Sequence, residues 1–502
     1  MSDNCRDCSR HLDASSTETN RAARSSSAET PPFPGRWLSM TESLCPVCLK
    51  VLPAQIRRQD DDVFLCRRCP EHGDFSEIIW RGLPDFEKWR RPKLPALGVN
   101  RHMESSSGCP FDCGLCPRHA QRPCTILWEI TQKCDLVCPV CFASSGGGDA
   151  VHRPASEIVD SLAYIKAQAG QIVFQISGGE PTTHPDLVEI TAAAAKMFPA
   201  VQLNTNGLRL SRDLSLAQKL KDAGLSWVFL QFDTLDDETC RAIRGRPLVQ
   251  EKLKTIDNLA KVGLPTVLTP TIVKGLNDSE LGALVRLAAG KSSVRGLHFQ
   301  PMTSSGRNSF LGENSRLTLP ELLTALGRQV PALDVSLAFP PGCEHERCSF
   351  HLRFRRLPDG TLIPRKSQEQ SCCGGPPKTT DTPSDPAQTA AGRDRAVDII
   401  LRSWSSGGGS GSASAAAPAE KATLAIPMAP KSQPASDVFD EFMRKTAQET
   451  FSVTAMAFQD VWTADLERLR GCCVHVFNPP DRFVPFCAMN LTSRDGQGLH
   501  RR

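Results

Sequence analysis

The sequence lacks the features that assign many chains to a broad class at once. Lysine and arginine together number 59 against 55 acidic residues, so the net charge of +4 gives no general argument for nucleic-acid binding. No stretch approaches the ~20 consecutive apolar residues of a membrane span, and residues 1–7 do not show the basic and then apolar pattern of a secretory signal. We therefore predict a soluble cytoplasmic protein, with no membrane span and no nucleic-acid partner.

Cysteine, by contrast, is abundant. The 502 residues include 21 cysteines, and 40% of the residues are hydrophobic, which is enough for several domains and at least one sizeable core. In a reducing compartment clustered cysteines more often bind metal than form disulfides. The clusters are Cys45/Cys48, Cys66/Cys69, Cys109/Cys113/Cys116/Cys124, Cys134/Cys138/Cys141, Cys343/Cys348, Cys372/Cys373 and Cys472/Cys473/Cys487.

The first two clusters form a pair of C-x2-C knuckles. Cys45 and Cys48 are separated from Cys66 and Cys69 by seventeen residues, a spacing that can bring four sulfurs into a tetrahedron. Zinc and a rubredoxin-like single iron both accept four thiolates, so the spacing does not choose the metal. A metal that only stabilises the fold of this small module is an equally good interpretation.

Two further clusters share the spacing C-x3-C-x2-C. Cys134, Cys138 and Cys141 follow the apolar run 125–131, and three thiolates after a strand can hold an iron-sulfur cluster with one iron left open. The other run, 109–116, has no strand pattern before it, and Cys124 can supply a fourth thiolate. We predict a closed auxiliary cluster there, with a zinc site as the alternative.

Residues 125–302 alternate between short β-rich runs and helical patterns. Six such runs interleaved with helices predict a parallel α/β sheet. Polar residues follow several of them, where a parallel barrel builds its site. The runs are 126–131, 172–176, 201–204, 227–232, 266–272 and 296–300.

The strand, the C-x3-C-x2-C run and a second strand ending in Ser-Gly-Gly-Glu-Pro (177–181) resemble the radical S-adenosylmethionine (SAM) superfamily over residues 125–302. The resemblance implies a partial (β/α)6 TIM-type barrel, a [4Fe-4S] cluster on Cys134, Cys138 and Cys141, and SAM on its open iron. Electron transfer would cleave SAM to a 5′-deoxyadenosyl radical. This chain has Val140 where many members have an aromatic residue.

The resemblance also implies which residues bind SAM. Gly178 and Gly179 let the backbone approach the ligand, and Glu180 offers a carboxylate to the SAM ammonium. Contacts to SAM or substrate are expected for Asn206, Gln231 and Asp233. Taken one at a time, these three residues are interpreted equally well as ordinary strand-end turns.

The order of segments along the chain resembles a narrower branch of this superfamily. These segments are a four-cysteine module, the cysteine run 108–117, the radical SAM core and an ending that carries Cys472, Cys473 and Cys487. The branch contains archaeal tetraether lipid synthase and enzymes described as methylating a dihydro-hydroxymethylpterin. This implies a multi-cluster enzyme that makes carbon-carbon bonds or methylates a lipid or pterin-like substrate, with a single iron in the amino-terminal knuckles. Its electron donor would be a low-potential protein such as ferredoxin or flavodoxin. The alternatives are a radical SAM peptide-maturation enzyme and a zinc-binding regulatory or scaffold protein.

The predicted organisation places an α/β radical SAM core between smaller cysteine-containing parts. Cys343 and Cys348 are further candidate metal ligands. The predicted parts are a disordered tail (1–40), a four-cysteine rubredoxin- or zinc-ribbon-like module (41–95), an auxiliary-cluster segment (96–124), the core (125–310), a cysteine-containing extension (311–374), a flexible linker (375–436) and a small cysteine-containing C-terminal segment (437–502).

Overall fold

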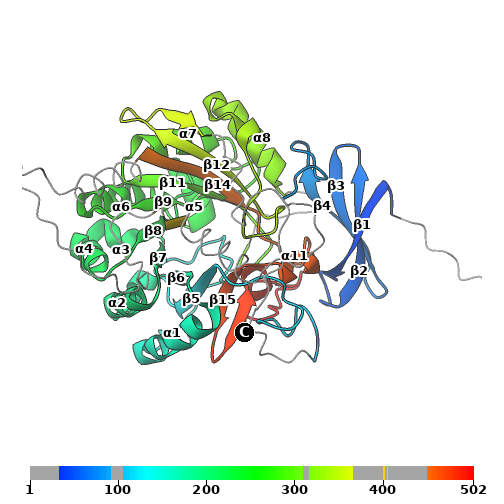
Figure 1. The fold of residues 1–502 in the computed structure, drawn as a ribbon, viewed down its shortest axis with the longest axis horizontal. Helices are drawn as coiled ribbons and strands as arrows, with labels where there is room; N and C mark the ends of the chain where they lie inside the picture. The colour runs from blue at the N-terminus through cyan, green and yellow to red at the C-terminus, as the bar shows by residue number, and fades with distance from the viewer. Residues whose placement is uncertain are drawn as a thin grey trace, which may run out of the picture. The chain divides into compact units, whose positions relative to one another are not determined.

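Figure 1 presents the computed structural model, which describes residues 33–91, 106–308, 316–365, 400, 401, 404 and 449–501. Residues 1–32 of the predicted disordered tail and most of the predicted linker lie outside these residues, as do Cys372 and Cys373. Among the described helices, none is long and apolar enough to cross a membrane.

A four-stranded antiparallel sheet forms the amino-terminal module. Its strands follow one another in space as they do in the chain: β1 (Arg36–Leu44), β2 (Val51–Gln59), β3 (Asp62–Cys69) and β4 (Gly73–Arg81). In β2 the buried side chains of Leu52, Ala54 and Ile56 alternate with more exposed ones, as a strand with one covered face requires. The module begins at Arg36, inside the segment predicted to be disordered.

The second sheet contains the predicted barrel. Six parallel strands stand in the order β5, β6, β7, β8, β9, β11, and all six predicted runs are confirmed. Pro270 separates β9 from the short strand β10, because proline cannot donate to a strand ladder. The bounds are β5 (Thr125–Thr131), β6 (Val173–Gly178), β7 (Ala200–Thr205), β8 (Trp227–Leu230), β9 (Thr266–Leu268), β10 (Thr271–Ile272) and β11 (Val294–Pro301).

Helices connect these strands and cover the outer face of the sheet (Figure 1). In the first of them Ile158, Leu162 and Ile165 are fully buried against the sheet, as their spacing predicts. The helices are α1 (Ala155–Ala169), α2 (Leu187–Met197), α3 (Leu208–Arg212), α4 (Leu214–Asp222), α5 (Asp237–Arg244), α6 (Val249–Val262), α7 (Leu281–Gly290) and, after β11, α8 (Leu319–Gln329). The fold is therefore an α/β fold with a partial (β/α)6 barrel.

The carboxy-terminal segment completes both edges of the barrel sheet. β14 (Thr450–Met456) pairs in parallel with β11, and β15 (Val474–Asn478) pairs in parallel with β5. Beyond them lie the antiparallel strands β12 (Ser349–Arg356), β13 (Leu362–Pro364) and β16 (Arg482–Pro485). Two short helices, α11 (Leu466–Arg470) and α12 (Phe486–Met489), belong to the same segment. The segment thus shields strand edges that the core alone would leave open.

One part of the predicted linker is structured. Ile400, Leu401 and Trp404 are helical and pack against inward-facing side chains of the barrel, including Trp227 and Phe229. The indole N–H of Trp404 donates to Ser452 Oγ at 3.0 Å. We therefore correct the linker prediction at this point, because apolar residues spaced for one helix face lie within the polar stretch.

Candidate functional site

The amino-terminal module brings four metal-binding side chains together. The ligand atoms of Cys45, Cys48, Cys69 and His72 all lie within 4.8 Å of one another. Cys66, predicted as the fourth ligand, is elsewhere, and its thiol contacts Ser76 Oγ at 3.4 Å. Cys66 and Cys69 both belong to β3, and residues three apart on a strand point to opposite faces. His72, in the turn after β3, takes the place that Cys66 was predicted to fill.

This donor set allows a sharp test. Three thiolates and one imidazole form a recognised structural zinc set, whereas a rubredoxin-like iron needs four thiolates. Replacing His72 with Ala should weaken zinc binding by more than the roughly 10–100-fold that the loss of an outer-shell partner costs. Cys66→Ser is the matched control and should leave zinc binding unchanged. Metal analysis against a competing chelator measures both variants, and a loss confined to Cys66→Ser would contradict the assignment.

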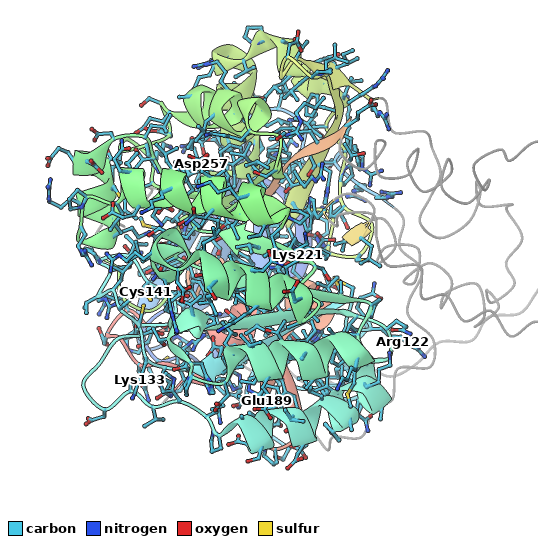
Figure 2. All side chains as sticks on the ribbon, turned by 90° about the vertical axis from the view of Figure 1, so that its left-hand side faces the viewer. Arg122, Lys133, Cys141, Glu189, Lys221 and Asp257 are labelled. Atoms are coloured by element: carbon cyan, nitrogen blue, oxygen red, sulfur yellow. The ribbon has the colours of Figure 1, made fainter. Side chains whose placement is uncertain are left out.

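The second candidate centre is the loop after β5. Arg122 and Lys133, which precede and follow this strand, lie on opposite sides of the view in Figure 2, with Cys141 on the side of Lys133. The loop therefore stands at the carboxyl end of the parallel strands, where barrel enzymes place their sites. Burial raises the pKa of Cys134 to about 12, so its thiol is protonated until a metal displaces the proton.

The three thiols of this loop share one apolar environment. Cys134, Cys138 and Cys141 pack with Leu136 of the same loop and with side chains of α3 and α6. Burial also raises the pKa of Cys138. An apolar environment of this kind suits an iron-sulfur cluster held by thiolates. The three cysteines therefore fit the [4Fe-4S] cluster that the sequence predicts.

The two glycines after β6 approach the cysteine loop closely. A Cβ atom on Gly178 would lie 2.3 Å from the carbonyl oxygen of Thr131, and one on Gly179 would lie 2.3 Å from that of Lys133. The Gly179 N–H donates to the Thr131 carbonyl at 2.8 Å, and the Glu180 N–H donates to Lys133 at the same distance. Glycine is required here because β6 is fastened directly to the start of the cysteine loop.

Glu180 is fully enclosed by protein donors. Its carboxylate accepts hydrogen bonds from the Thr182 N–H and hydroxyl, from the Thr205 hydroxyl at 2.6 Å and from the Asn206 N–H at 2.7 Å. Burial raises the pKa of Glu180, and these donors oppose that shift. The structure therefore gives Glu180 a bracing role between β6 and β7, and its contact with the SAM ammonium stays a prediction.

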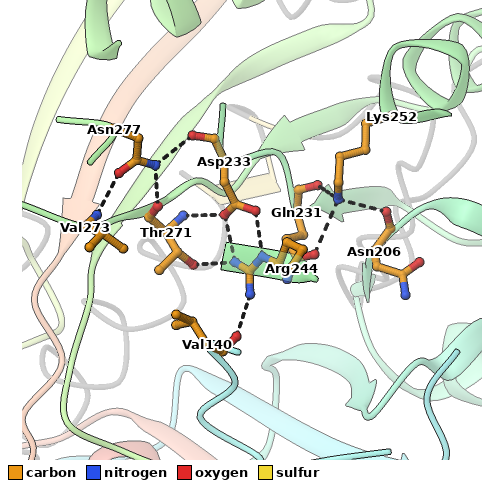
Figure 3. A network of polar contacts seen from close by, with 9 residues as sticks. All are labelled: Val140, Asn206, Gln231, Asp233, Arg244, Lys252, Thr271, Val273 and Asn277. Carbon is orange, nitrogen blue, oxygen red and sulfur yellow. Dashed lines mark hydrogen bonds and ion pairs between the residues drawn. The ribbon is translucent and has the colours of Figure 1, made fainter. Parts of the chain in front are cut away.

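The other predicted contact residues also brace the loop. The Asn206 amide donates to Asp135 in the cysteine loop at 2.6 Å. Asp233 is fully buried, and Arg244 donates to both of its oxygens, at 2.7 and 2.8 Å. Arg244 also donates a hydrogen bond to the backbone carbonyl of Val140 at 2.8 Å, as drawn in Figure 3. Val140 lies between the second and third cysteines of the loop.

A buried lysine completes this network. Lys252 on α6 donates to the backbone carbonyls of Gln231, at 2.5 Å, and Asn206, at 3.2 Å (Figure 3). With its amide group turned, the Gln231 side chain also accepts from Arg244. Asn206, Gln231 and Asp233 thus lie in one network in which protein groups engage their side chains, and their contacts with SAM or substrate stay a prediction.

The sequence analysis did not predict the two arginines that donate hydrogen bonds to the cysteine loop. Arg244 ends α5, and Arg307, after β11, donates to the Cys138 carbonyl at 2.5 Å and to the Ser145 carbonyl at 3.0 Å. The backbone of Arg307 also pairs with that of Cys141. A buried arginine has no sequence signature of its own, because arginine is usually exposed.

The remaining cysteines fall into three groups. The thiols of Cys109 and Cys113 are in hydrogen-bonding contact, with Cys116 close by. Cys124 is not with them: its sulfur lies 3.1 Å from that of Cys473, with Cys343 in contact with both. The prediction of Cys124 as the fourth thiolate of the first group is therefore corrected.

Sheet register explains the new place of Cys124. β5 and β15 pair with Thr125 opposite Val474, so the residues just before them, Cys124 and Cys473, meet. The Cys124 N–H donates to the Cys473 carbonyl at 2.9 Å. This pairing spans most of the chain and could not be read from local spacing.

The third group joins the predicted extension to the carboxy-terminal segment. Burial raises the pKa of Cys472 and of Cys487, and Cys348 lies close enough to both to raise the two values further. Arg468 donates to the sulfur of Cys348 at 3.2 Å, and the Gln459 N–H donates to that of Cys487 at 3.3 Å. Cys343 and Cys348, both predicted as metal ligands, thus belong to two different groups.

Comparison with known proteins identifies the family. The family model described as the radical SAM superfamily matches residues 128–288. Over 478 residues the chain is 30% identical to the 7,8-dihydro-6-hydroxymethylpterin dimethyltransferase of Methanocaldococcus jannaschii, covering 90% of this chain and 94% of that protein. This chain belongs to the radical SAM superfamily.

Other matches cover parts of this radical SAM protein. Residues 37–81 match a model described as the HMPTM N-terminal zinc ribbon domain, in keeping with the amino-terminal sheet and its metal-binding group. A probable GTP 3′,8-cyclase of Pyrococcus abyssi is 31% identical over 174 residues, which is 34% of this chain and 56% of that protein. The solved structure of Streptococcus suis SuiB bound to its precursor peptide is 18% identical, with a TM-score of 0.35, over 42% of this chain and 46% of that one.

Proposed function

We propose that this radical SAM enzyme forms a carbon-carbon bond by methylating a pterin-like heterocycle. The name and near-complete coverage of the Methanocaldococcus jannaschii relative support the substrate class. The observation that carries the choice between a heterocycle and a lipid is a row of amide side chains on the inner face of the barrel.

The amide row crosses three neighbouring strands. In the sheet register Gln175 of β6 stands beside Gln202 of β7, which stands beside Trp227 of β8. The Trp227 indole donates to Gln202 at 2.8 Å, Gln202 contacts Asn204 at 2.5 Å, and Asn204 donates to Gln175 at 3.2 Å. Their strand neighbours, such as Phe174 and Leu203, pack outward in the helix-covered core, so the amides face inward.

Amides in this place favour a polar, planar substrate. The half-buried side chains of Gln175 and Asn204 have amide groups that the row does not use, and an apolar chain packed against them would leave those groups without partners, at a cost of about 1–3 kcal/mol each. A pterin ring carries alternating donors and acceptors that can pair with them. Replacing Gln202 with Leu should lower kcat/KM for the heterocycle by about tenfold or more, because the buried Gln202 amide holds Asn204 in place beside the substrate. SAM cleavage without substrate should stay unchanged in the same variant, and an unaltered kcat/KM would contradict the placement of the substrate.

The cofactors follow from the cysteine groups. We assign the SAM-binding [4Fe-4S] cluster to Cys134, Cys138 and Cys141, where it would supply the electron that cleaves SAM. Around it this chain's own residues hold the loop in place: Arg244 at Val140, Arg307 at Cys138 and Asn206 at Asp135. Zinc is assigned to Cys45, Cys48, Cys69 and His72 because the donor set suits it.

Auxiliary clusters are part of the same proposal. The groups around Cys109, Cys124 and Cys348 supply enough thiols for further iron-sulfur clusters, and a ferredoxin or flavodoxin would deliver the electrons. Replacing Cys109, Cys113 and Cys116 should spare SAM cleavage without substrate and impair product formation.

The proposal is tested with anaerobically reconstituted enzyme, reductant and SAM. Separate reactions receive a dihydropterin, an archaeal-type lipid or a peptide, and mass spectrometry follows 5′-deoxyadenosine and methylated product. We expect the dihydropterin alone to stimulate deoxyadenosine formation and to gain a methyl group. Stimulation by the peptide alone would indicate a peptide-maturation enzyme, and stimulation by the lipid alone would overturn the choice of substrate.

A further inference from the structure

A carboxylate stands on the inner face of β5, next to the SAM-binding loop. Glu129 lies two residues before the end of β5 and stands beside Ser177, the residue before Gly178. Its neighbours Trp128 and Ile130 pack into the helix-covered core, so the side chain of Glu129 points to the other face, into the barrel. No metal or hydrogen-bonding role was predicted for it.

Arg501 occupies this carboxylate with both arms of its guanidinium. Its two terminal nitrogens donate to the two oxygens of Glu129 at 2.8 and 2.5 Å. Its Nε donates to the side-chain oxygen of Asn490 at 2.8 Å, and Arg501 is close enough to Cys141 for the two to interact electrostatically. The pair therefore bridges β5 and the cysteine loop, with about a fifth of each side chain exposed (20% and 19%).

The segment 490–501 presents Arg501 in a defined way. Thr492 and Gly498 form an antiparallel bridge, and the Leu499 N–H donates to the Leu491 carbonyl at 2.9 Å. His500 contacts the carbonyl of Pro110 at 2.9 Å. Arg501 is thus carried by a folded segment that is also hydrogen-bonded to Gly306, and about a fifth of its side chain is exposed.

The chemistry of the pair matches that of the proposed substrate. A guanidinium offers a carboxylate two parallel N–H donors, and this fork-to-fork geometry is specific as well as strong. The 2-amino-4-oxopyrimidine edge of a pterin offers the same two donors, its ring N3–H and its 2-amino group. We propose that Glu129 recognises this edge of the substrate and that Arg501 holds the carboxylate until the substrate displaces it. This rests on the proposed function, which it extends by naming the specificity-determining residue.

The pairing of Arg501 with Glu129 and its displacement by the substrate each have a physical reason. A carboxylate left alone in a partly buried barrel is costly, so a built-in guanidinium keeps it paired and oriented in the absence of substrate. When the ring displaces Arg501, its charge can move to solvent, because the side chain is already partly exposed. Gln175 lies on the neighbouring strand and on the same face of the sheet as Glu129, and it accepts a hydrogen bond from Asn204.

The test measures ligand binding without reductant, so it does not depend on catalysis. The full-length protein is titrated with a dihydropterin and with the matching 2,4-dioxopteridine, which lacks the 2-amino donor. We expect wild type to prefer the amino compound, and Glu129→Gln to weaken its binding by about tenfold or more and to lose that preference. Arg501→Gln should tighten binding several-fold, because the competitor for the carboxylate is gone. Arg494→Gln, an exposed change in the same segment, should alter nothing.

Glu129→Gln and Arg501→Gln together distinguish substrate recognition by Glu129 from a purely structural ion pair. If Arg501 only fastens its segment to β5, both variants weaken binding together, and the inference is overturned. Glu129→Asp keeps the charge and serves where Glu129→Gln fails to fold; it should retain the preference for the amino compound. A wild-type protein that binds neither pteridine would overturn the proposed function itself, whereas binding without opposite shifts in the two variants would overturn only this inference.

Discussion

Replacing Cys134, Cys138 and Cys141 with alanine will abolish formation of 5′-deoxyadenosine by the reduced enzyme. These three thiols stand at the carboxyl end of β5, in one apolar environment, on a loop that β6 contacts through Gly178 and Gly179. Without the thiolates no cluster is held next to bound SAM, so the electron that cleaves it has no route. Chromatographic detection of deoxyadenosine, together with iron and sulfide analysis, measures the effect.

Cys240 provides the matched control for this triad. It is buried on α5 and packs in the same apolar environment as the three cysteines. If it served as a fourth ligand, the open iron would be closed and the triad assignment would be wrong. We expect Cys240→Ala to keep both the iron content and SAM cleavage. Persistence of cleavage in the triple variant would move the assignment to Cys109, Cys113 and Cys116.

The Arg244→Gln variant should show the largest loss of stability of any single substitution near the site. It leaves the carboxylate of Asp233 buried without its partner, and breaking a buried pair in this way costs about 3–5 kcal/mol. Burial raises the pKa of Asp233 and the attraction of Arg244 lowers it, so without Arg244 the buried carboxyl group must either stay charged without its partner or take up a proton, and both cost stability. The variant also releases the Val140 carbonyl, so we expect cluster content to fall as well.

Denaturant unfolding and iron analysis measure these two effects. Arg241→Gln, on the same helix, breaks only the exposed pair with Glu238 and should change neither quantity. Adding Asp233→Asn to Arg244→Gln should restore part of the stability, because the unpaired charge is gone, while the Val140 carbonyl stays unsupported. An Arg244→Gln protein of normal stability and iron content would contradict the bracing role.

The sequence predicted the parts of the fold that depend on local patterns. The six barrel strands follow from apolar runs between helical segments, and the triad that we propose for SAM binding follows from a strand next to three closely spaced cysteines. Those signals lie within a few residues of each other, so no knowledge of the tertiary structure is needed.

The ligand groups that differ from the prediction depend on contacts between residues far apart in the sequence or on strand geometry. Cys124 meets Cys473 because β15 joins the edge of the barrel sheet beside β5, and no local pattern gives that register. His72 replaces Cys66 in the metal-binding group because Cys66 lies on a strand face that points away from Cys69. Local spacing identified metal-binding segments and missed which ligands meet.

The strand-end residues show a third limit. Glu180, Asn206 and Asp233 were found from their positions after strands, and the structure gathers them beside the cysteine loop. Their partners, above all Arg244, come from elements whose contribution the sequence does not reveal. The sequence pattern predicts that these residues lie at the carboxyl ends of strands. The role of each side chain depends on which residues from other elements contact it.

The central claim is that Cys134, Cys138 and Cys141 hold a cluster whose open iron takes SAM. The most direct measurement is the electron paramagnetic resonance spectrum of the dithionite-reduced protein with and without SAM, on a variant that lacks Cys109, Cys113 and Cys116. The account predicts a [4Fe-4S] signal that changes when SAM is added and that disappears when the triad is also replaced. A protein that contains zinc without iron or sulfide, or a cluster signal that SAM leaves unchanged, would contradict it.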